Sequence, residues 1–563
     1  MNRPLLVLSL LLLTSCSNPR SEMPTTPPSD ALIIHGGIAW IGPEQKPSPD
    51  TAILVRKGRI EFVGPLAEAE KRAPGARRLD AKGMTILPGL VDSHAHVDGL
   101  GKMLAIVDLK GTTSAEDAAA RVGEQAKSLP AGDWVEGRGW DQNDWPEMRY
   151  PTADVLDRVA GDHPVYLRRI DGHAGWANSA AMRAAGINSS TKEPDGGRIL
   201  RDGSGNPTGV FIDNAENLFD GKIPAPSREL RKARLRASLE NIASNGLTAV
   251  HEAGSENPEE VIAIYRELIG EGSMPVRVYY MLPEGDPKLE SWFSTGPLVD
   301  FGNKLTVRAV KVYADGALGS RGAALLAPYS DEPSAKGLLV TQPERVEEIA
   351  KKAADAGFQV GTHAIGDRGV KIVLDAYQKA GVKPEDRFRI EHYQVASLPD
   401  IERLGKMGVI AAMQPTHATS DMPWAEKRLG AERLEGAYAW RKVLDAGGHL
   451  ALGSDFPIED VNPFYGIYSA VTRQDHDGHP PGGWRPSEKL TLAEAVRGFT
   501  VVSAYAAFEE ETRGTIEAGK RADFTIVDGD FASAPQSDLW ETKVRYTIVN
   551  GDVVFKAPGE GGR

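Results

Sequence analysis

Two histidines lie one residue apart in the stretch LPGLVDSHAHVDG, residues 87 to 99, directly after an apolar run that ends in Pro-Gly. Side chains alternate with a period of two along a β-strand, so His94 and His96 point to the same side of such a strand. Two imidazoles on one face can bind a metal ion. A single His-x-His pair also arises by chance, so the rest of the chain has to decide between the two interpretations.

Four further ligand-capable residues follow apolar segments elsewhere in the chain. Lys311 lies in VRAVKVYADG, His363 in GTHAIGD, His392 in RIEHYQ and Asp455 in ALGSDFP. Each has an alternative explanation, because a strand-end histidine can hydrogen-bond to a carbonyl group and a strand-end aspartate often caps the next helix. A shared metal site requires a fold that brings the ends of several strands together.

The order of the apolar segments predicts such a fold. Strand-like segments alternate with amphipathic helices, which is typical of a parallel sheet, and eight such strands predict an α/β protein built on a (β/α)₈ TIM barrel. The eight predicted strands are TILPGLVDSHAH, GLTAVHEAG, VRVYYML, VRAVKVYADG, FQVGTHAIGD, FRIEHYQ, GVIAAMQP and HLALGSDF. Barrel active sites lie at the C-terminal ends of the strands, where all six candidate ligands are expected.

A ninth candidate strand, PVYLRRIDGHAGWA, competes for a place in the barrel. We place it in an insertion between strands one and two, at about residues 105–225. The reason is that GLTAVHEAG follows a long predicted helix over residues 228–245, as a barrel strand should.

Both ends of the folded chain contain short predicted strands separated by Gly and turn residues. Chain termini often lie close together, so we expect residues 31–84 and 512–558 to form one small composite β-sandwich. The metal-dependent barrel domain then covers residues 85–511, including the insertion.

The first residues resemble an export signal. Arg3 precedes the apolar run Leu5 to Leu13, which is too short to span a bilayer, so residues 1–15 are predicted to be cleaved. The run ends in Leu-Thr-Ser-Cys, which resembles the bacterial lipobox, and Cys16 is the only cysteine in the chain. We therefore predict a lipid on Cys16, a disordered Pro-, Ser- and Thr-rich tether over residues 16–30, and an exported protein held at a membrane, on the periplasmic side of a bacterial envelope. An ordinary secretory signal cut elsewhere is the alternative.

Composition excludes several other classes of function. The chain has 563 residues, 41% of them hydrophobic, and a formal charge of −13 without a long basic run. This argues against nucleic acid as a partner and against a polybasic membrane patch. Neither a G-x-S-x-G nucleophile elbow nor a G-x-x-x-x-G-K-[ST] phosphate loop is present.

With these motifs assembled, the chain resembles the amidohydrolase superfamily, in the branch that includes the N-substituted formamide deformylases. The resemblance covers nearly the whole chain after the tether, and every position that binds metal in the superfamily has a matching residue here. It implies one or two divalent ions, most often zinc, and a barrel joined to a small sandwich. The matching segments are PGLVDSHAH, GRGWDQNDW, DGHAGWANSAAM, VKVYADGALGSRGAAL, THAIGD, RIEHYQ, QPTHATSDMPWAE, LALGSDFPIE and GTIEAGKRADFTIVD.

Lys311 needs a separate explanation, because a protonated ammonium group has no lone pair for a metal. In related enzymes with two metal ions, the equivalent lysine is carbamylated by carbon dioxide and bridges the ions. Burial between cations lowers the lysine pKa and favours that chemistry. A salt bridge from Lys311 to a nearby carboxylate is the alternative.

The predicted reaction is hydrolysis of a C–N bond, most often that of an amide. The group removed from the nitrogen could be N-formyl or another N-acyl group. Zinc lowers the pKa of bound water to roughly 7, which supplies hydroxide at neutral pH. Asp455 would accept the proton of that water and pass it to the departing amine. Asp455 and Lys311 are therefore the predicted catalytic residues.

Substrate-binding residues are less clearly indicated. By resemblance His173, in the insertion, faces the pocket, and Trp140 and Trp145 could form its wall. Four residues just past strand ends are further candidates, each of which could equally be a structural hydrogen-bonding group: Glu252, Asp315, Arg321 and His417.

Two functions from different classes compete. The first is an exported, membrane-tethered, metal-dependent amidohydrolase that acts on a small-molecule amide. The second is a non-catalytic lipoprotein that keeps the barrel to bind a metal or another ligand. Self-association of the chain is compatible with both. Metal content and a hydrolysis screen distinguish the two functions.

Overall fold

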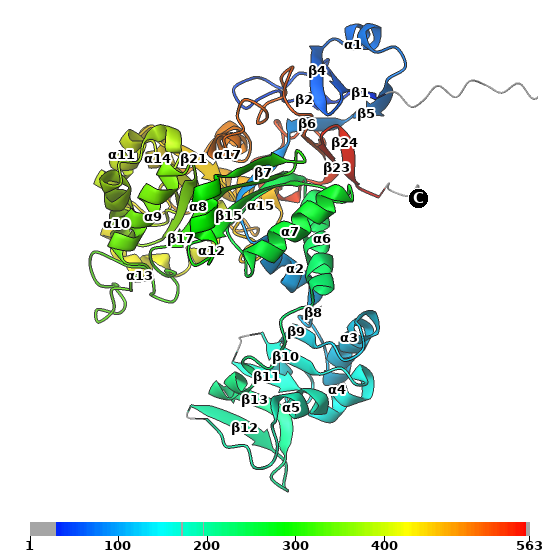
Figure 1. Cartoon of the computed structure of the whole chain (residues 1–563), viewed down its shortest axis with the longest axis vertical. Helices are drawn as coiled ribbons and strands as arrows, with labels where there is room; N and C mark the ends of the chain where they lie inside the picture. Colours follow the sequence, from blue (N-terminus) through cyan, green and yellow to red (C-terminus); the bar gives the residue numbers. More distant parts are fainter. Residues whose placement is uncertain (1–29, 171–172, 195, 559–563) are drawn as a thin grey trace, which may run out of the picture.

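The computed structural model describes residues 30–170, 173–194 and 196–558 (Figure 1). The predicted signal peptide, the predicted lipidation site Cys16 and all of the predicted tether except Asp30 lie outside the described residues. Within the described residues, no helix has the length and apolar character needed to cross a membrane.

Eight parallel strands form a barrel at the centre of the molecule, which confirms the predicted fold class. Every predicted barrel strand corresponds to an observed strand, in the predicted order. The strands are β7 (Leu90–Ala95), β14 (Leu247–Glu252), β15 (Arg277–Pro283), β17 (Leu305–Tyr313), β18 (Gln359–Ala364), β19 (Arg389–His392), β20 (Ile410–Met413) and β21 (His449–Leu452). A short strand, β16 (Leu298–Phe301), pairs antiparallel with β17.

Backbone hydrogen bonds between the end of β7 and the segment just beyond β21 close the barrel. The amide of Asp455, just beyond β21, donates to the carbonyl of His94 at 2.8 Å, and the amide of His96 donates to the carbonyl of Phe456 at 2.9 Å. The closure therefore places three of the candidate ligands beside one another.

Helices surround the strands, and their ends follow familiar capping chemistry. The Ser227 hydroxyl accepts a hydrogen bond from the Leu230 amide at the start of α6, and Gly246, with φ +87°, then turns the chain into β14. The helices of the barrel region are α6 (Arg228–Ser244), α7 (Pro258–Gly270), α8 (Leu289–Thr295), α9 (Pro343–Asp355), α10 (Asp367–Lys379), α11 (Leu398–Met407), α12 (Pro415–Asp421), α13 (Ala425–Leu434), α14 (Trp440–Asp445), α15 (Pro463–Thr472), α16 (Leu492–Gly498) and α17 (Val501–Ala506).

Two sheets built from both ends of the chain form the predicted sandwich. The first contains β4 (Arg59–Gly64), β3 (Ala52–Arg56), β1 (Ala31–His35) and β5 (Arg77–Asp80), and α1 (Leu66–Arg72) packs against it. The second contains β2 (Ile38–Ala39), β6 (Met84–Pro88), β22 (Phe524–Asp528), β23 (Val544–Val549) and β24 (Asp552–Lys556). Ile34 and Ile53 of the first sheet share one buried apolar cluster with Phe524 and Ile526 of the second.

The insertion folds around a sheet of its own and projects from the barrel after α2 (Val97–Ala105) (Figure 1). The competing ninth strand lies here, as β10 and β11, which confirms that it is not part of the barrel. Its sheet contains, in order, β12 (Gly197–Arg201), β13 (Pro207–Asp213), β11 (Ala174–Ala177), β10 (Val165–Arg169), β9 (Val135–Trp140) and β8 (Val107–Asp108). Its helices are α3 (Ala115–Ser128), α4 (Ala153–Ala160) and α5 (Ser179–Ala185).

Candidate metal centre

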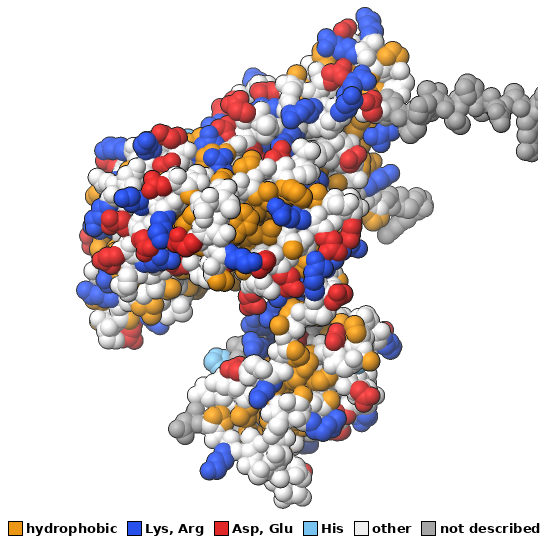
Figure 2. Space-filling view, in the orientation of Figure 1, with side chains coloured by type: hydrophobic (Ala, Val, Ile, Leu, Met, Phe, Trp, Pro, Cys, Tyr) orange, Lys and Arg blue, Asp and Glu red, His pale blue; other side chains and the backbone are white. Residues whose placement is uncertain are grey.

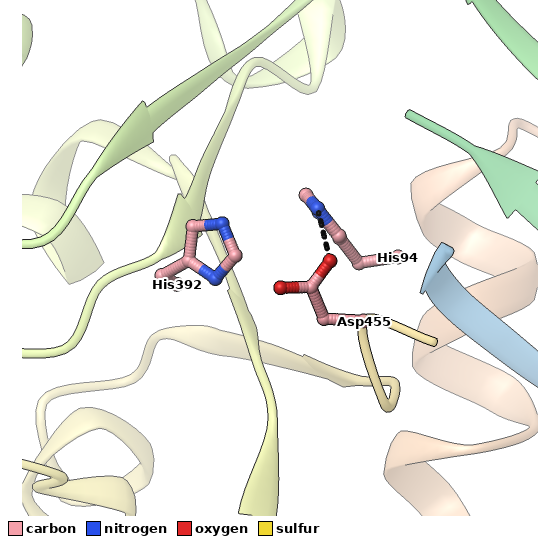
Figure 3. Close-up of side chains that lie close together, drawn as sticks. All are labelled: His94, His392 and Asp455. Carbon is pink, nitrogen blue, oxygen red and sulfur yellow. Dashed lines mark ion pairs between the residues drawn. The ribbon is translucent and has the colours of Figure 1, made fainter. Parts of the chain in front are cut away.

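The barrel brings all six candidate ligands to one end. Asp455 lies among the histidines: its Oδ1 atom is 3.5 Å from His94 Nε2 and 3.2 Å from His96 Nε2. Figure 3 shows His94, His392 and Asp455 pointing toward one another from three separate segments of the chain. Residues that are hundreds of positions apart in the sequence therefore share one site.

The remaining two candidates, Lys311 and His363, lie against the same group of side chains. Lys311 Nζ is 3.4 Å from His94 Nε2, and Lys311 is almost completely buried. The ring of His392 lies between two other imidazoles, with centroid distances of 4.5 Å to His363 and 4.7 Å to His94.

The donor atoms fit a divalent metal ion. One ligand atom each from His94, His392 and Asp455 can be chosen such that all three lie within 4.8 Å of one another. Two buried atoms here, His363 Nε2 and Asp455 Oδ1, have no hydrogen-bond partner among the described residues. A buried polar atom without a partner is costly, and imidazole nitrogen and carboxylate oxygen are donors that zinc accepts.

Two of the ligands have a left-handed backbone that neighbouring groups hold in place. The φ angle is +69° at His392 and +64° at Asp455, a conformation that costs about 1–3 kcal/mol outside glycine. Gln414 Oε1 lies 2.8 Å from His392 Nδ1. The buried carboxylate of Asp92 accepts hydrogen bonds from the Ser454 amide and hydroxyl and from the His94 amide. These bonds fix the loop that carries Asp455.

A buried charged network lies behind His94, and the sequence analysis did not identify it. His94 Nδ1 is 2.5 Å from Glu391 Oε2, and Arg389 Nε donates to Glu391 Oε1 at 2.5 Å. All three side chains are inaccessible to solvent. The signal available in the sequence was the period of two, which places Arg389 and Glu391 on one face of the RIEH strand.

Burial keeps two of the candidate histidines in the form that can bind a metal. It lowers the pKa of His94 to about 4 and that of His363 to about 3, with the charge of Lys311 acting in the same direction. Burial also lowers the pKa of Lys311 to about 8. The imidazoles of His94 and His363 are therefore neutral at pH 7, with a lone pair available.

The carboxylates of the site remain ionised in spite of their burial. Burial alone would raise the pKa of Asp455, but the imidazoles of His96, His94 and His417 beside the carboxylate lower it to about 2. Burial likewise opposes ionisation of Glu391, yet Arg389 and His94 hold its pKa well below the ordinary value. Both groups are acceptors at neutral pH.

A cavity of about 480 Å³ opens beside these residues. His417, one of the predicted substrate-binding residues, lines it, and its Nε2 atom lies 3.8 Å from Asp455 Oδ2. Several lining residues were not singled out from the sequence, although Asp421 and Trp424 lie in the segment QPTHATSDMPWAE. These further lining residues include Tyr313, Leu318, Ile365, Gln394, Asp421, Trp424, Ile458 and Glu459.

The prediction that Trp140 and Trp145 wall the pocket is wrong. Both indoles are buried in the core of the insertion, stacked with a centroid distance of 6.1 Å. Their N–H groups donate to the carbonyls of Leu167 and Thr112, so neither is available to a substrate. Large aromatic residues fill cores as readily as they line pockets, and no periodic pattern distinguished the two cases here.

Two predicted substrate-binding carboxylates instead support the backbone. Glu252 is fully buried and accepts a hydrogen bond of 2.7 Å from the Val97 amide, in the first turn of α2. Asp315 accepts from the amides of Ala324, Ile365 and Gly366 at 2.8–2.9 Å. Asp315 therefore holds the loop after β18 in place beside His363.

The last two predicted residues lie away from the cavity. Arg321 forms an ion pair of 3.1 Å with Asp331, and it is not among the described residues that line the cavity. His173 lies in the insertion, with 74% of its side chain exposed and its Nδ1 atom 3.0 Å from Asp213. The structure does not bring His173 to the metal centre.

Comparison with known proteins gives consistent matches. The model of the Amidohydrolase family matches residues 77–555. The chain is 34% identical to the protein named "Putative amidohydrolase YtcJ" of Bacillus subtilis, over 93% of this chain and 99% of that protein. It is 30% identical to the N-substituted formamide deformylase of Arthrobacter pascens, over 94% of this chain and 99% of the enzyme.

A solved structure has the same fold. The crystal structure of an uncharacterized metal-dependent hydrolase from Pyrococcus furiosus superimposes with a TM-score of 0.73 and 28% sequence identity. The match covers 89% of this chain and 99% of that chain.

Proposed function

The chain belongs to the amidohydrolase family and is a hydrolase that acts on carbon–nitrogen bonds, and from this premise we propose that it hydrolyses a small-molecule amide with the help of Asp455. The observation that carries the proposal is the position of this carboxylate, which lies within 3.5 Å of both His94 and His96 and borders the cavity.

Six residues would hold one or two divalent ions, and zinc suits their nitrogen and oxygen donors. They are His94, His96, Lys311, His363, His392 and Asp455. A divalent ion at such a site lowers the pKa of a coordinated water to roughly 7 and polarises a substrate carbonyl.

Asp455 then moves the proton. Its low pKa leaves it ionised at pH 7, and its Oδ1 atom has no hydrogen-bond partner, so it can accept a proton from the attacking water. When the tetrahedral intermediate collapses, Asp455 gives this proton to the departing amine nitrogen. The left-handed backbone at Asp455, held by the Asp92 and Ser454 hydrogen bonds, keeps the carboxylate oriented toward the cavity.

Lys311 would act as a carbamate. Its pKa of about 8 makes the neutral amine, which is the form that reacts with carbon dioxide, accessible near neutral pH. The alternative of a salt bridge receives no support, since Lys311 forms no ion pair with a carboxylate among the described residues. Reconstituting the metal-free enzyme with zinc should restore activity faster with bicarbonate than without it, and Lys311→Met should abolish that difference. Equal rates with and without bicarbonate would exclude the carbamate.

The cavity indicates a compact, largely apolar amide. Leu318, Ile365, Trp424 and Ile458 supply apolar surface, and about 480 Å³ suits a small molecule. The relative from Arthrobacter pascens is named for deformylation of N-substituted formamides, which favours an N-formyl or short N-acyl group.

A panel of amides tests this proposal. Formamides, acetamides, aminoacyl amides and cyclic amides would be offered to metal-free protein and to the same preparation restored with zinc. We expect turnover of at least one class, dependent on zinc. Binding of amides without turnover under both conditions would instead support the non-catalytic binding protein.

The location of the protein is a separate proposal, supported by the short apolar run and the single cysteine at Cys16. We expect wild-type cells to incorporate labelled palmitate into the protein at the envelope, and Cys16→Ala to prevent incorporation. Stable anchoring takes two or more acyl chains, so a wild-type protein found free of the membrane would contradict the proposal.

A further inference from the structure

The N-terminal part of the sandwich, residues 31–84, carries a positive charge within an acidic chain. Residues 31–84 contain nine Lys and Arg against six Asp and Glu, a formal charge of +3 in a chain whose total is −13. Figure 2 shows Lys and Arg side chains interspersed with Asp and Glu side chains at this end of the molecule, around α1 and β4. A local excess of positive charge in an acidic protein favours an anionic ligand at that place.

Four of the cations at this end of the molecule surround one cavity. The cavity has a volume of about 430 Å³ and lies where the first sheet of the sandwich meets the turn between β23 and β24 and the turn before β17. Its cationic lining residues are Lys57, Arg59, Arg77 and Arg521, and its carboxylates are Asp30 and Asp552.

Arg521 is the most informative of these residues. Only 7% of it is exposed, and its Nη2 atom pairs with Asp300 at 2.8 Å. Its Nε and Nη1 atoms are buried without a hydrogen-bond partner among the described residues. The second cavity that Arg521 borders measures about 10 Å³, which is at most room for one water molecule. A buried guanidinium with unused N–H groups is costly unless a ligand or an ordered water accepts hydrogen bonds from those groups.

The other three cations are also incompletely neutralised. Lys57, Arg59 and Arg77 are exposed and form no ion pair among the described residues, although Arg59 Nη1 donates to the Gly519 carbonyl at 2.9 Å. Of the two carboxylates, Asp30 already lies 3.5 Å from Arg56, outside this set. The cavity therefore has more positive than negative charge available to a ligand.

From this arrangement we infer that the cavity binds a phosphate group, at a site separate from the metal centre. Guanidinium groups match the tetrahedral oxygens of phosphate, and several cations on different segments suit a group that carries up to two negative charges. The cavity is larger than phosphate alone, so the ligand includes an organic part: the phosphate is that of a phospholipid headgroup or of a free phosphorylated small molecule.

The site lies far from the proposed chemistry. Asn303 lines it just before β17, whereas Lys311 lies near the other end of the same strand. Eight residues of extended strand span roughly 25 Å. A phosphate bound here does not enter the metal centre, so its binding can be measured independently of amide hydrolysis.

The test uses the full chain with Cys16→Ala, so that no acyl chain contributes to membrane binding. Inorganic phosphate is titrated into the protein by calorimetry at low salt. Arg59→Gln/Arg77→Gln removes two exposed cations of the cavity, and Lys71→Gln/Lys82→Gln removes two exposed cations of the same segment that do not line it. We expect the first double variant to weaken phosphate binding roughly tenfold or more and the second to leave it unchanged.

Vesicles distinguish the two sources of the phosphate. If the ligand is a lipid headgroup, the protein cosediments with phosphatidylcholine vesicles that contain phosphatidic acid, not with phosphatidylcholine alone, and the cavity variant loses this binding. If the ligand is a free phosphorylated molecule, inorganic phosphate binds but neither vesicle does. Phosphate affinity that is equal in wild type and the cavity variant, or binding to neither phosphate nor vesicles, overturns the inference.

Discussion

His94 and Glu391 form a hydrogen bond of 2.5 Å between two side chains that are both inaccessible to solvent. Because Arg389 holds Glu391 in its ionised form, the Nδ1 atom of His94 carries the proton and donates it to the carboxylate. The Nε2 atom therefore keeps its lone pair and faces Asp455 and Lys311. A carboxylate behind a histidine orients the ring and makes it a better ligand.

Replacing Glu391 with Gln should weaken zinc binding roughly 10- to 100-fold, because the amide removes the negative charge that fixes the His94 ring. Competition with a chromophoric chelator measures the affinity. Asp523→Asn is the matched control, since it breaks the buried pair with Arg277 at 2.8 Å, away from the metal centre. The control should lower thermal stability without changing zinc affinity, and equal losses in the two variants would count against the role of Glu391.

Replacing Asp455 with Asn should reduce kcat by at least ~10²–10⁴-fold, the usual contribution of general acid–base catalysis, and change KM less. The amide keeps the size of the side chain but cannot accept a proton from water. If Asp455 only capped a helix, Asn would serve equally well and kcat would hardly change. Circular dichroism, metal content and kcat are measured on one preparation, and full metal with wild-type kcat would falsify the proton transfer.

Most of the barrel could be predicted because its signals are local. Each strand is an apolar run with its own turn residues, and His94, His363 and His392 stand at the ends of such runs. The supporting groups could not be predicted, since their partners are distant in sequence. Asp92 acts on Ser454, and Glu391 acts on His94, across gaps of 362 and 297 residues. The only local sign of either contact in the sequence was a carboxylate residue inside an apolar strand, Asp92 in one case and Glu391 in the other.

The histidines of the metal-free protein should make its stability fall on acidification. Well above pH 6.5 these rings are neutral in the folded and in the unfolded protein. Below pH 6.5 the histidines of the unfolded chain bind protons. The buried rings do not, because their pKa values are about 4 for His94 and about 3 for His363. Each of these two histidines should lower the free energy of unfolding by roughly 2 kcal/mol between pH 6.5 and pH 5. Urea unfolding at the two pH values should show a smaller loss for His363→Gln than for wild type, and identical losses would contradict this assignment.

Two tryptophan variants test the correction to the pocket wall. Trp140→Phe removes a buried hydrogen bond to the Leu167 carbonyl and should lower stability by about 1 kcal/mol without raising KM. Trp424→Phe changes a residue that lines the cavity and should raise KM while affecting stability less. A higher KM for Trp140→Phe but not for Trp424→Phe would indicate that Trp140, and not Trp424, contacts the substrate.

The most direct test of the whole account is the metal content of the gently purified protein, measured by elemental analysis for wild type and for His94→Ala/His96→Ala. The convergence of these histidines with Asp455 predicts one or two equivalents of a divalent metal, with zinc foremost, in the wild type. The double variant should lose most of it while circular dichroism shows a retained fold. Equal metal in the two proteins, or none in the wild type, would contradict the metal centre.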